Sequence, residues 1–207
     1  MVNLDVPAPR LGRWTRRTAL AALLSGAVWL AGCQSKPDFR NTDVTGADFA
    51  QDFQLTGHDG KAYSLADFRG KVVVIFFGYT QCPDVCPGTM AELAQVMQTL
   101  GPDAERVQVI FVTVDPERDT PELLANYVPA FDPRFLGLYG DAEVTERTAK
   151  AFRVFYQKVP GKTPGSYTVD HTAGSYVYDP QGKLRLFIKH GTGPEPIAHD
   201  LRVLLKG

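Results

Sequence analysis

Apolar residues follow two spacings along this chain, and their alternation predicts a mixed α/β protein. Residues 70–79 (GKVVVIFFGY) and 107–115 (VQVIFVTVD) are nearly continuous apolar runs, which is typical of central strands covered on both faces of a sheet. Between them, residues 89–100 carry apolar side chains at helical spacing. One face of that predicted helix holds Met90, Leu93, Met97 and Leu100.

Shorter patterns complete the predicted domain. Residues 53–65 alternate around Asp59-Gly60 and residues 175–188 alternate around Pro180–Gly182, so each segment predicts a β-hairpin. Three further segments have the spacing of amphipathic helices, namely 120–128 (with Thr120 as N-cap), 143–159 and 195–206. We therefore expect an α/β sandwich with one central mixed sheet, an N-terminal β-hairpin and flanking helices.

The first 32 residues differ from the rest in charge and pattern. They carry four arginines and one aspartate, so a chain of formal net charge −1 has a net −4 on the remainder. The basic stretch leads into TALAALLSGAVWL, an apolar run of signal-peptide length that is too short to span a membrane. The segment ends in LAGC, which resembles the cleavage box of bacterial lipoproteins. We expect residues 1–32 to be a lipoprotein-type signal peptide and Cys33 to be lipidated; the alternative is an uncleaved anchor with a spare thiol.

The polar residues 33–50 lack periodicity and predict a lipidated tether that holds a domain at 51–207 near a membrane. Export would place this domain in an oxidising compartment, facing the periplasm. The mildly acidic domain has no basic stripe, which argues against binding to nucleic acid.

Two of the three cysteines, Cys82 and Cys86, lie in GYTQCPDVCP, between the first buried strand and the helix that follows it. Reactive groups gather at such junctions, and a helix N-terminus favours thiolate and lowers the pKa of a thiol. A structural disulfide here would close a very short loop and contribute little chain-entropy stabilisation. The pair therefore indicates a redox couple or half of a metal site.

The spacing of the two cysteines suits a metal better than a disulfide. In a helix, residues four apart have Cβ atoms about 5–6 Å from each other, whereas a disulfide needs about 3.5–4.5 Å. A metal ion with bonds of about 2.3 Å to each sulfur is less demanding, although a bend between loop and helix would still let the disulfide form. Asp84, between the cysteines, attracts a cation, caps the helix, or does both.

Among the four histidines, His171 is the best placed to complete a metal site. It lies in TVDHTAG, after the loop VPGKTPGSY and before the strand SYVY, and in a sandwich of this kind that loop faces the helix that follows the cysteines. We expect His58, His190 and His199 to be exposed and inert.

Two other features have plainer interpretations. Residues 115–122 (DPERDTPE) could orient a partner or tune the site, but the pattern is that of a turn followed by a helix cap. Met90 could be a weak fourth contact to a metal, but a methionine at helical spacing is typical of a core residue.

The segments GYTQCPDVCP, VDPERDTPE and VDHTAGS, in this order, resemble the motifs of the Sco/SenC proteins, which are copper-binding relatives of thioredoxin. The resemblance covers residues 50–206. It implies a thioredoxin-like fold and a copper site made by Cys82, Cys86 and His171. It also implies a role in delivering copper to, or reducing the cysteines of, the binuclear copper A site in cytochrome c oxidase subunit II.

The chemistry of the residues agrees with this resemblance. Thiolates select copper(I) and an added imidazole lets a site also hold copper(II), whereas zinc prefers a closed tetrahedral shell. Our hypothesis is a lipid-anchored copper metallochaperone. Its rival is a thiol–disulfide oxidoreductase in which Cys82 and Cys86 are the catalytic pair. A peroxidase of the peroxiredoxin kind shares the fold, but TQC does not match its local motif.

Overall fold

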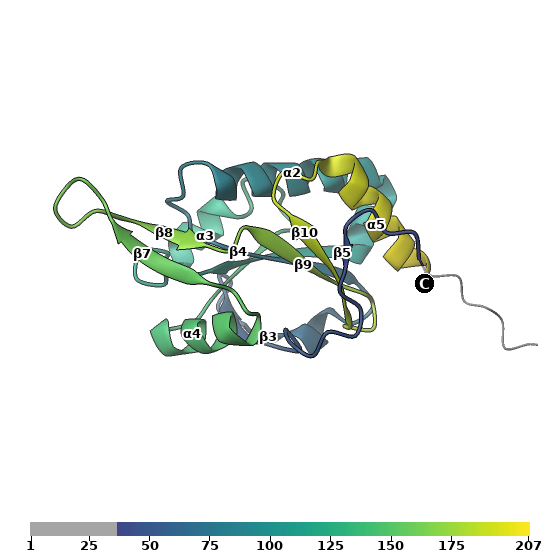
Figure 1. The fold of residues 1–207 in the computed structure, drawn as a ribbon, viewed down its shortest axis with the longest axis horizontal. Helices are drawn as coiled ribbons and strands as arrows, with labels where there is room; N and C mark the ends of the chain where they lie inside the picture. Colours follow the sequence, from purple (N-terminus) through teal and green to yellow (C-terminus); the bar gives the residue numbers. More distant parts are fainter. Residues whose placement is uncertain (1–36) are drawn as a thin grey trace, which may run out of the picture. The chain divides into compact units, whose positions relative to one another are not determined.

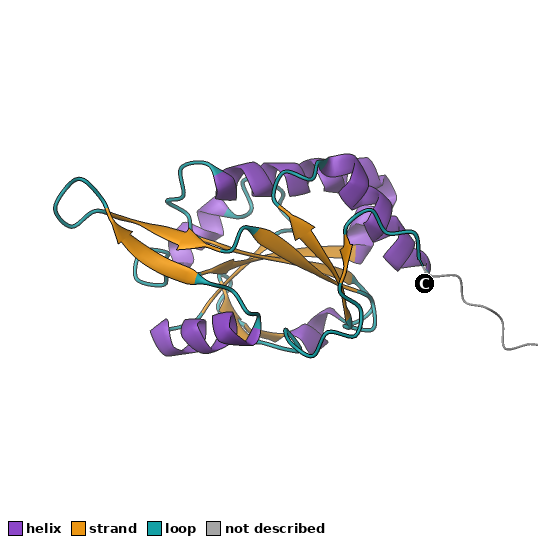
Figure 2. Ribbon diagram, viewed as in Figure 1, coloured by secondary structure: helices purple, strands orange, loops and turns teal. Residues whose placement is uncertain are grey.

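A mixed sheet of eight strands lies at the centre of residues 37–207, the part of the chain that this computed structural model describes. The strand order is β1-β10-β9-β4-β5-β6-β2-β3, and Figure 2 shows the sheet between layers of helix. β4, β5 and β6 are parallel, whereas the remaining neighbours pair antiparallel. The strands are β1 Thr42–Asp43, β2 Gln54–Gly57, β3 Ala62–Ser64, β4 Val72–Gly78, β5 Val107–Thr113, β6 Leu136–Tyr139, β9 Gly174–Tyr178 and β10 Leu184–Lys189.

Helices cover both faces of this sheet. Figure 1 shows α2 (Val85–Leu100) and α5 (Pro194–Lys206) on one face and α4 (Ala142–Ala151) on the other. The shorter elements are α3 (Pro121–Tyr127) and the 3-10 helices η2 (Leu65–Phe68) and η3 (Gly101–Arg106). This arrangement confirms the predicted α/β sandwich, with β2–β3 as its N-terminal hairpin.

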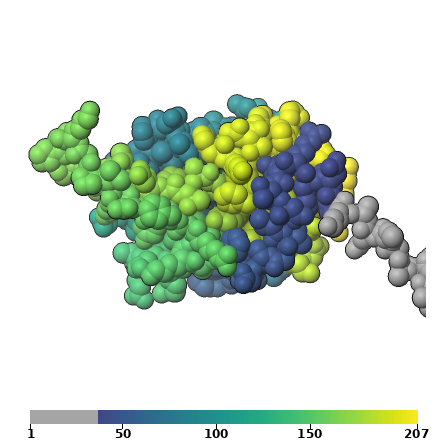
Figure 3. Space-filling view, in the orientation of Figure 1, coloured from purple at the N-terminus to yellow at the C-terminus, as the bar shows by residue number. Residues whose placement is uncertain are grey.

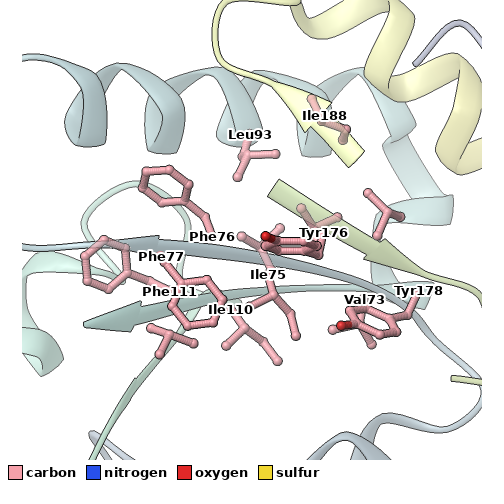
Figure 4. Packing of buried hydrophobic residues seen from close by; sticks show 14 of the residues in the cluster. Val73, Ile75, Phe76, Phe77, Leu93, Ile110, Phe111, Tyr176, Tyr178 and Ile188 are labelled. Carbon is pink, nitrogen blue, oxygen red and sulfur yellow. The ribbon is translucent and has the colours of Figure 1, made fainter. Parts of the chain in front are cut away.

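The two central strands form the core and bring two loops together. Every residue of β4 is buried, and Figure 4 shows Leu93 of α2 pointing toward the sheet above the aromatic side chains of β4 and β5. The register pairs Val72 with Val107 and Gly78 with Thr113. Because the strands are parallel and end at the same level, the loops that follow them lie at one edge of the sheet.

The helix predicted for residues 143–159 is too long. α4 ends at Ala151, and Arg153 adopts the left-handed conformation (φ 55°) directly afterwards. The next residues form β7 (Tyr156–Pro160), which pairs antiparallel with β8 (Tyr167–His171) in a separate two-stranded sheet. Residues 152–159 hold three aromatic and two β-branched residues, which favour a strand once a partner strand is present.

Residues that precede the predicted domain boundary also pack on the domain. The compact unit begins at Asp38, before the boundary predicted at residue 51. β1 pairs with β10, and the buried carboxylate of Asp200 accepts hydrogen bonds from the backbone N–H groups of Arg40 and Asn41. These contacts hold a segment whose sequence has no periodicity.

The predicted signal peptide (1–32) and Cys33 lie outside the described residues. Among residues 37–207, no helix has both the length and the apolar character needed to cross a membrane.

Candidate metal centre

The two cysteines lie where β4 gives way to α2. Cys82 is in the connecting loop and half-buried, whereas Cys86 is in the first turn of α2 and fully buried. Both are free thiols, and the backbone N–H of Cys86 donates to Cys82 Sγ at 3.4 Å. Asp84 occupies the N-cap position of α2, but its side chain makes no capping hydrogen bond, so the predicted capping role is wrong.

Gly78, the last residue of β4, makes room for the buried sulfur. A Cβ atom at this position would lie 3.0 Å from Cys86 Sγ and 2.9 Å from a ring carbon of Phe76. Real Cβ atoms rarely approach other atoms so closely, so a side chain here would push the sulfur from its position. The glycine of GYTQCPDVCP is therefore part of how the site is built.

His171 ends β8 and lies against the cysteines, as the sequence predicts. Its Nε2 is 3.3 Å from Cys86 Sγ, and its Nδ1 is 3.1 Å from the backbone oxygen of Thr172. Because a carbonyl oxygen only accepts, Nδ1 carries the proton of the neutral ring and the lone pair of Nε2 faces the sulfur. The rings of Phe76 and Tyr79 pack edge-on against the imidazole, with centroids 6.0 Å away in each case.

Burial sets the protonation of these groups. It raises the pKa of the Cys86 thiol, so the expectation that the helix N-terminus lowers the pKa of the pair is wrong for Cys86. Burial outweighs the helix dipole here because the ionised sulfur would lose its hydration. Burial also lowers the pKa of His171, with its hydrogen bond to Thr172 acting in the opposite direction. Without a metal, the site therefore holds a neutral thiol beside a neutral imidazole.

The three side chains together fit a soft metal ion. The sulfur atoms of Cys82 and Cys86 and a nitrogen of His171 all lie within 4.8 Å of one another. Three donors spread evenly around one ion at about 2.3 Å lie about 4 Å from one another, so only a small closing movement is needed to share one ion. Cys82 and His171 also line an open cavity of about 360 Å³, which gives an ion a route in and out.

Residues 115–119 form a turn between β5 and α3, which we call the 115–119 turn. Its side chains do more than connect these two elements. Thr120 does cap α3, because its hydroxyl accepts from the N–H of Leu123. Asp119, however, accepts hydrogen bonds from the N–H (3.0 Å) and the hydroxyl (2.6 Å) of Thr80, in the cysteine loop. Burial raises the pKa of Asp119, although the hydrogen bonds from Thr80 act in the opposite direction. The turn therefore braces the loop that carries Cys82, a role that the sequence pattern alone did not favour.

The other histidines do not join the cysteines, but they are not all inert. His58 Nδ1 accepts from the N–H of Gly137 at 3.0 Å, so this half-buried ring joins the β2–β3 hairpin to β6. His190 is exposed and lies 3.0 Å from the hydroxyl of Thr89, and His199 contacts Asp200. Met90 is fully buried among the core residues, as expected of a methionine on the inner face of a helix.

A sheet with helices on both faces and a cysteine pair at a strand–helix junction defines a thioredoxin-like protein with a candidate metal site. The SCO1/SenC family model matches residues 41–206. The mitochondrial SCO2 homolog of Mus musculus is 37% identical in an alignment 192 residues long, which covers 89% of this chain and 75% of that protein. The chain therefore belongs to the SCO1/SenC family.

Solved structures agree with this assignment. Bradyrhizobium japonicum ScoI with copper bound is 44% identical, with a TM-score of 0.68 over 73% of this chain and 96% of that chain. A SCO1/SenC family lipoprotein from Bacillus anthracis str. Ames is 28% identical, with a TM-score of 0.67 over 80% of this chain and 98% of that chain. A member of this family has thus been solved with copper bound.

Proposed function

We propose that this chain is a copper metallochaperone that holds one copper ion through Cys82 Sγ, Cys86 Sγ and His171 Nε2. The observation that carries the proposal is the meeting of these three donors, which come from a loop, a helix and a strand far away in the sequence. Two thiolates favour copper(I), and the imidazole allows the site to hold copper(II) as well. Both cysteine thiols must release a proton to bind, so copper loading requires the reduced pair.

The recipient we propose is the copper A site of cytochrome c oxidase subunit II. Three donors leave one side of the cargo ion open, and Cys82 and His171 face the cavity. A ligand of the receiving protein can enter from this side before the donors of the carrier leave, which lowers the barrier to transfer. The resemblance of GYTQCPDVCP, VDPERDTPE and VDHTAGS to the motifs of the Sco/SenC proteins supports this recipient.

We further propose that the mature chain is held at the membrane by a lipid on Cys33, with its domain facing the periplasm. The LAGC segment after an apolar run supports this anchor. The lipoprotein among the solved relatives supports it as well.

A thiol–disulfide oxidoreductase acting on an exported partner is the second candidate. Its support is that Cys82 and Cys86 are free and in contact. Cys82, the more exposed of the two, would attack the partner disulfide, and Cys86 would resolve the mixed disulfide. The raised pKa of Cys86 makes that second step slow, because the thiolate is the nucleophile. The imidazole of His171, which thiol exchange does not require, completes a group of three donors and favours the copper carrier.

His171→Ala separates the two functions. Loss of an outer-shell partner alone typically weakens metal binding 10–100-fold, so we expect loss of a direct ligand to weaken copper(I) binding by about 100-fold or more. Thiol–disulfide exchange should largely survive. The measurement is a titration of the reduced protein against a competing copper(I) chelator, with the rate of exchange with a small disulfide followed in parallel.

His190→Ala is the matched control, because this exposed histidine also lies near the first turns of α2 through its contact with Thr89. It should leave copper affinity unchanged. Parent-like copper affinity in His171→Ala would rule out the three-ligand site and leave the dithiol as the functional unit.

A further inference from the structure

The ligand His171 lies on a hairpin that projects from the domain. Figures 1 and 3 show β7 and β8 extending from the body, and most residues of both strands are exposed or half-exposed. A donor at the base of such a hairpin keeps its distance from the cysteines only if other contacts hold the strands in place. The contacts of this hairpin therefore bear directly on the geometry of the site.

Arg118, in the 115–119 turn, contacts the hairpin through its guanidinium, and the neighbouring Glu117 forms an ion pair with Lys158 of β7. Arg118 Nη1 donates to the backbone oxygen of Tyr167 at 3.0 Å, and its guanidinium carbon lies 3.6 Å from the centroid of the Tyr167 ring. The hydroxyl of Tyr167 in turn donates to Asp115 Oδ1 at 2.9 Å, and the other carboxylate oxygen of Asp115 pairs with Arg118 Nε. The Asp115 side chain is fully buried, which strengthens these charge-assisted contacts.

The same guanidinium also contacts the loop that carries Cys82. Nη1 of Arg118 donates to Gln81 Oε1 at 3.1 Å, next to Cys82 in the sequence. Its guanidinium carbon lies 5.6 Å from the centroid of the Tyr79 ring, and that ring packs against His171. One side chain thus touches the segment of the thiol ligand and the segment of the imidazole ligand.

We infer that Arg118 is a positioning residue that holds the β7–β8 hairpin against the cysteine loop and so sets the distance between His171 and the two sulfur atoms. The inference rests on the proposed copper site, to which it adds a residue that contacts none of the three donors. An arginine suits this role because its planar fork bonds in several directions while its flat face stacks on a ring. A lysine would keep the charge and lose this geometry.

The first test measures hairpin mobility without metal. The protein is the reduced full-length chain in detergent with Cys33→Ser, so that Cys82 and Cys86 are its remaining thiols. Hydrogen exchange of the amides in 156–171 should be about tenfold faster in Arg118→Gln, with β4 and β5 unchanged. Unchanged hairpin exchange, or a uniform increase that includes β4 and β5, would overturn the inference.

Two further variants serve as a control and as a substitute in this hydrogen-exchange test. Arg185→Gln is the matched control, because Arg185 is similarly half-buried (22% against 20% side-chain exposure), pairs with Asp179 and contacts an aromatic ring, but lies on β10. It should leave hairpin exchange unchanged, and faster hairpin exchange in it would overturn the inference. If Arg118→Gln does not fold, Tyr167→Leu replaces it, because this substitution leaves the Arg118–Asp115 pair intact. The same faster exchange of the amides in 156–171, with β4 and β5 unchanged, is then expected.

The second test measures copper(I) affinity in the same proteins. We expect Arg118→Gln and Arg118→Lys to bind about tenfold more weakly than the parent, as is usual for residues that orient ligands. Parent-like affinity in either variant would overturn the positioning role while leaving the proposed function standing. A parent that binds no copper would instead reject the proposed function, and the exchange experiment would still decide whether Arg118 holds the hairpin.

Discussion

Cys86→Ser is expected to abolish copper(I) binding at stoichiometric concentrations, with a loss of affinity of about 1000-fold or more, which corresponds to roughly 4 kcal/mol. Serine is similar in size but offers a hard oxygen in place of the soft sulfur that copper(I) prefers. The buried Cys86 sulfur also lies 3.3 Å from His171 Nε2. Its removal leaves Cys82 and His171 as the two remaining donors of the proposed site.

Copper content after gel filtration of the reduced protein measures this effect, in the Cys33→Ser background. Met90→Leu is the control, because Met90 lies one turn further along α2 and is fully buried in the core. It should retain one copper per chain. A Cys86→Ser protein that also retains one copper would show that the ion binds elsewhere.

Of the substitutions proposed for this chain, Asp200→Ala is expected to destabilise the fold most. It should lower the free energy of unfolding by about 3 kcal/mol. The fully buried carboxylate accepts from the backbone N–H groups of Arg40 and Asn41, from the Asn41 side chain and from His199. Alanine leaves these donors unpaired and releases the N-terminal segment from α5. Urea unfolding at pH 7 measures the loss.

The matched control is Asp141→Ala, which removes an exposed N-cap of α4. It should cost only about 1 kcal/mol. Equal losses for the two substitutions would show that the N-terminal segment contributes little to the stability of the domain.

The contribution of Asp200 should also depend on pH. Burial alone would raise its pKa, but the hydrogen bonds from Arg40, His199 and Asn41 outweigh burial and lower it. A carboxyl with a lowered pKa stabilises the fold fully above its unfolded value of about 3.9, and this stabilisation is lost as the pH falls through the folded value. The stability difference between the parent and Asp200→Ala should therefore shrink below about pH 4.

The sequence predicts the centre of the fold well because burial there is unambiguous. Residues 72–78 are apolar without interruption and residues 107–113 nearly so, which is why both central strands are confirmed, and the placement of Cys82 and Cys86 follows from them. The place of His171 beside the cysteines could also be predicted, because the order of elements brings its loop to the edge of the sheet where the cysteines lie. These are long-range consequences of strong local patterns.

The sequence does not predict features that depend on contacts with distant parts of the chain. The sequence around residue 156 has apolar residues at a spacing that fits a helix, and only the pairing with β8 makes it a strand. The bracing roles of Arg118 and Asp119 depend on residues more than 30 positions away in the sequence, Tyr167 and Thr80. The raised pKa of Cys86 depends on how deeply the first turn of α2 is covered. None of these has a local sequence pattern of its own.

X-ray absorption at the copper edge tests the central claim most directly. The reduced Cys33→Ser chain is loaded with one equivalent of copper(I), and the same is done with His171→Ala. We predict two sulfur neighbours and one imidazole nitrogen in the parent, and loss of the nitrogen in the variant. A parent spectrum with sulfur neighbours alone, or one that His171→Ala leaves unchanged, would contradict a site built from both cysteines and His171.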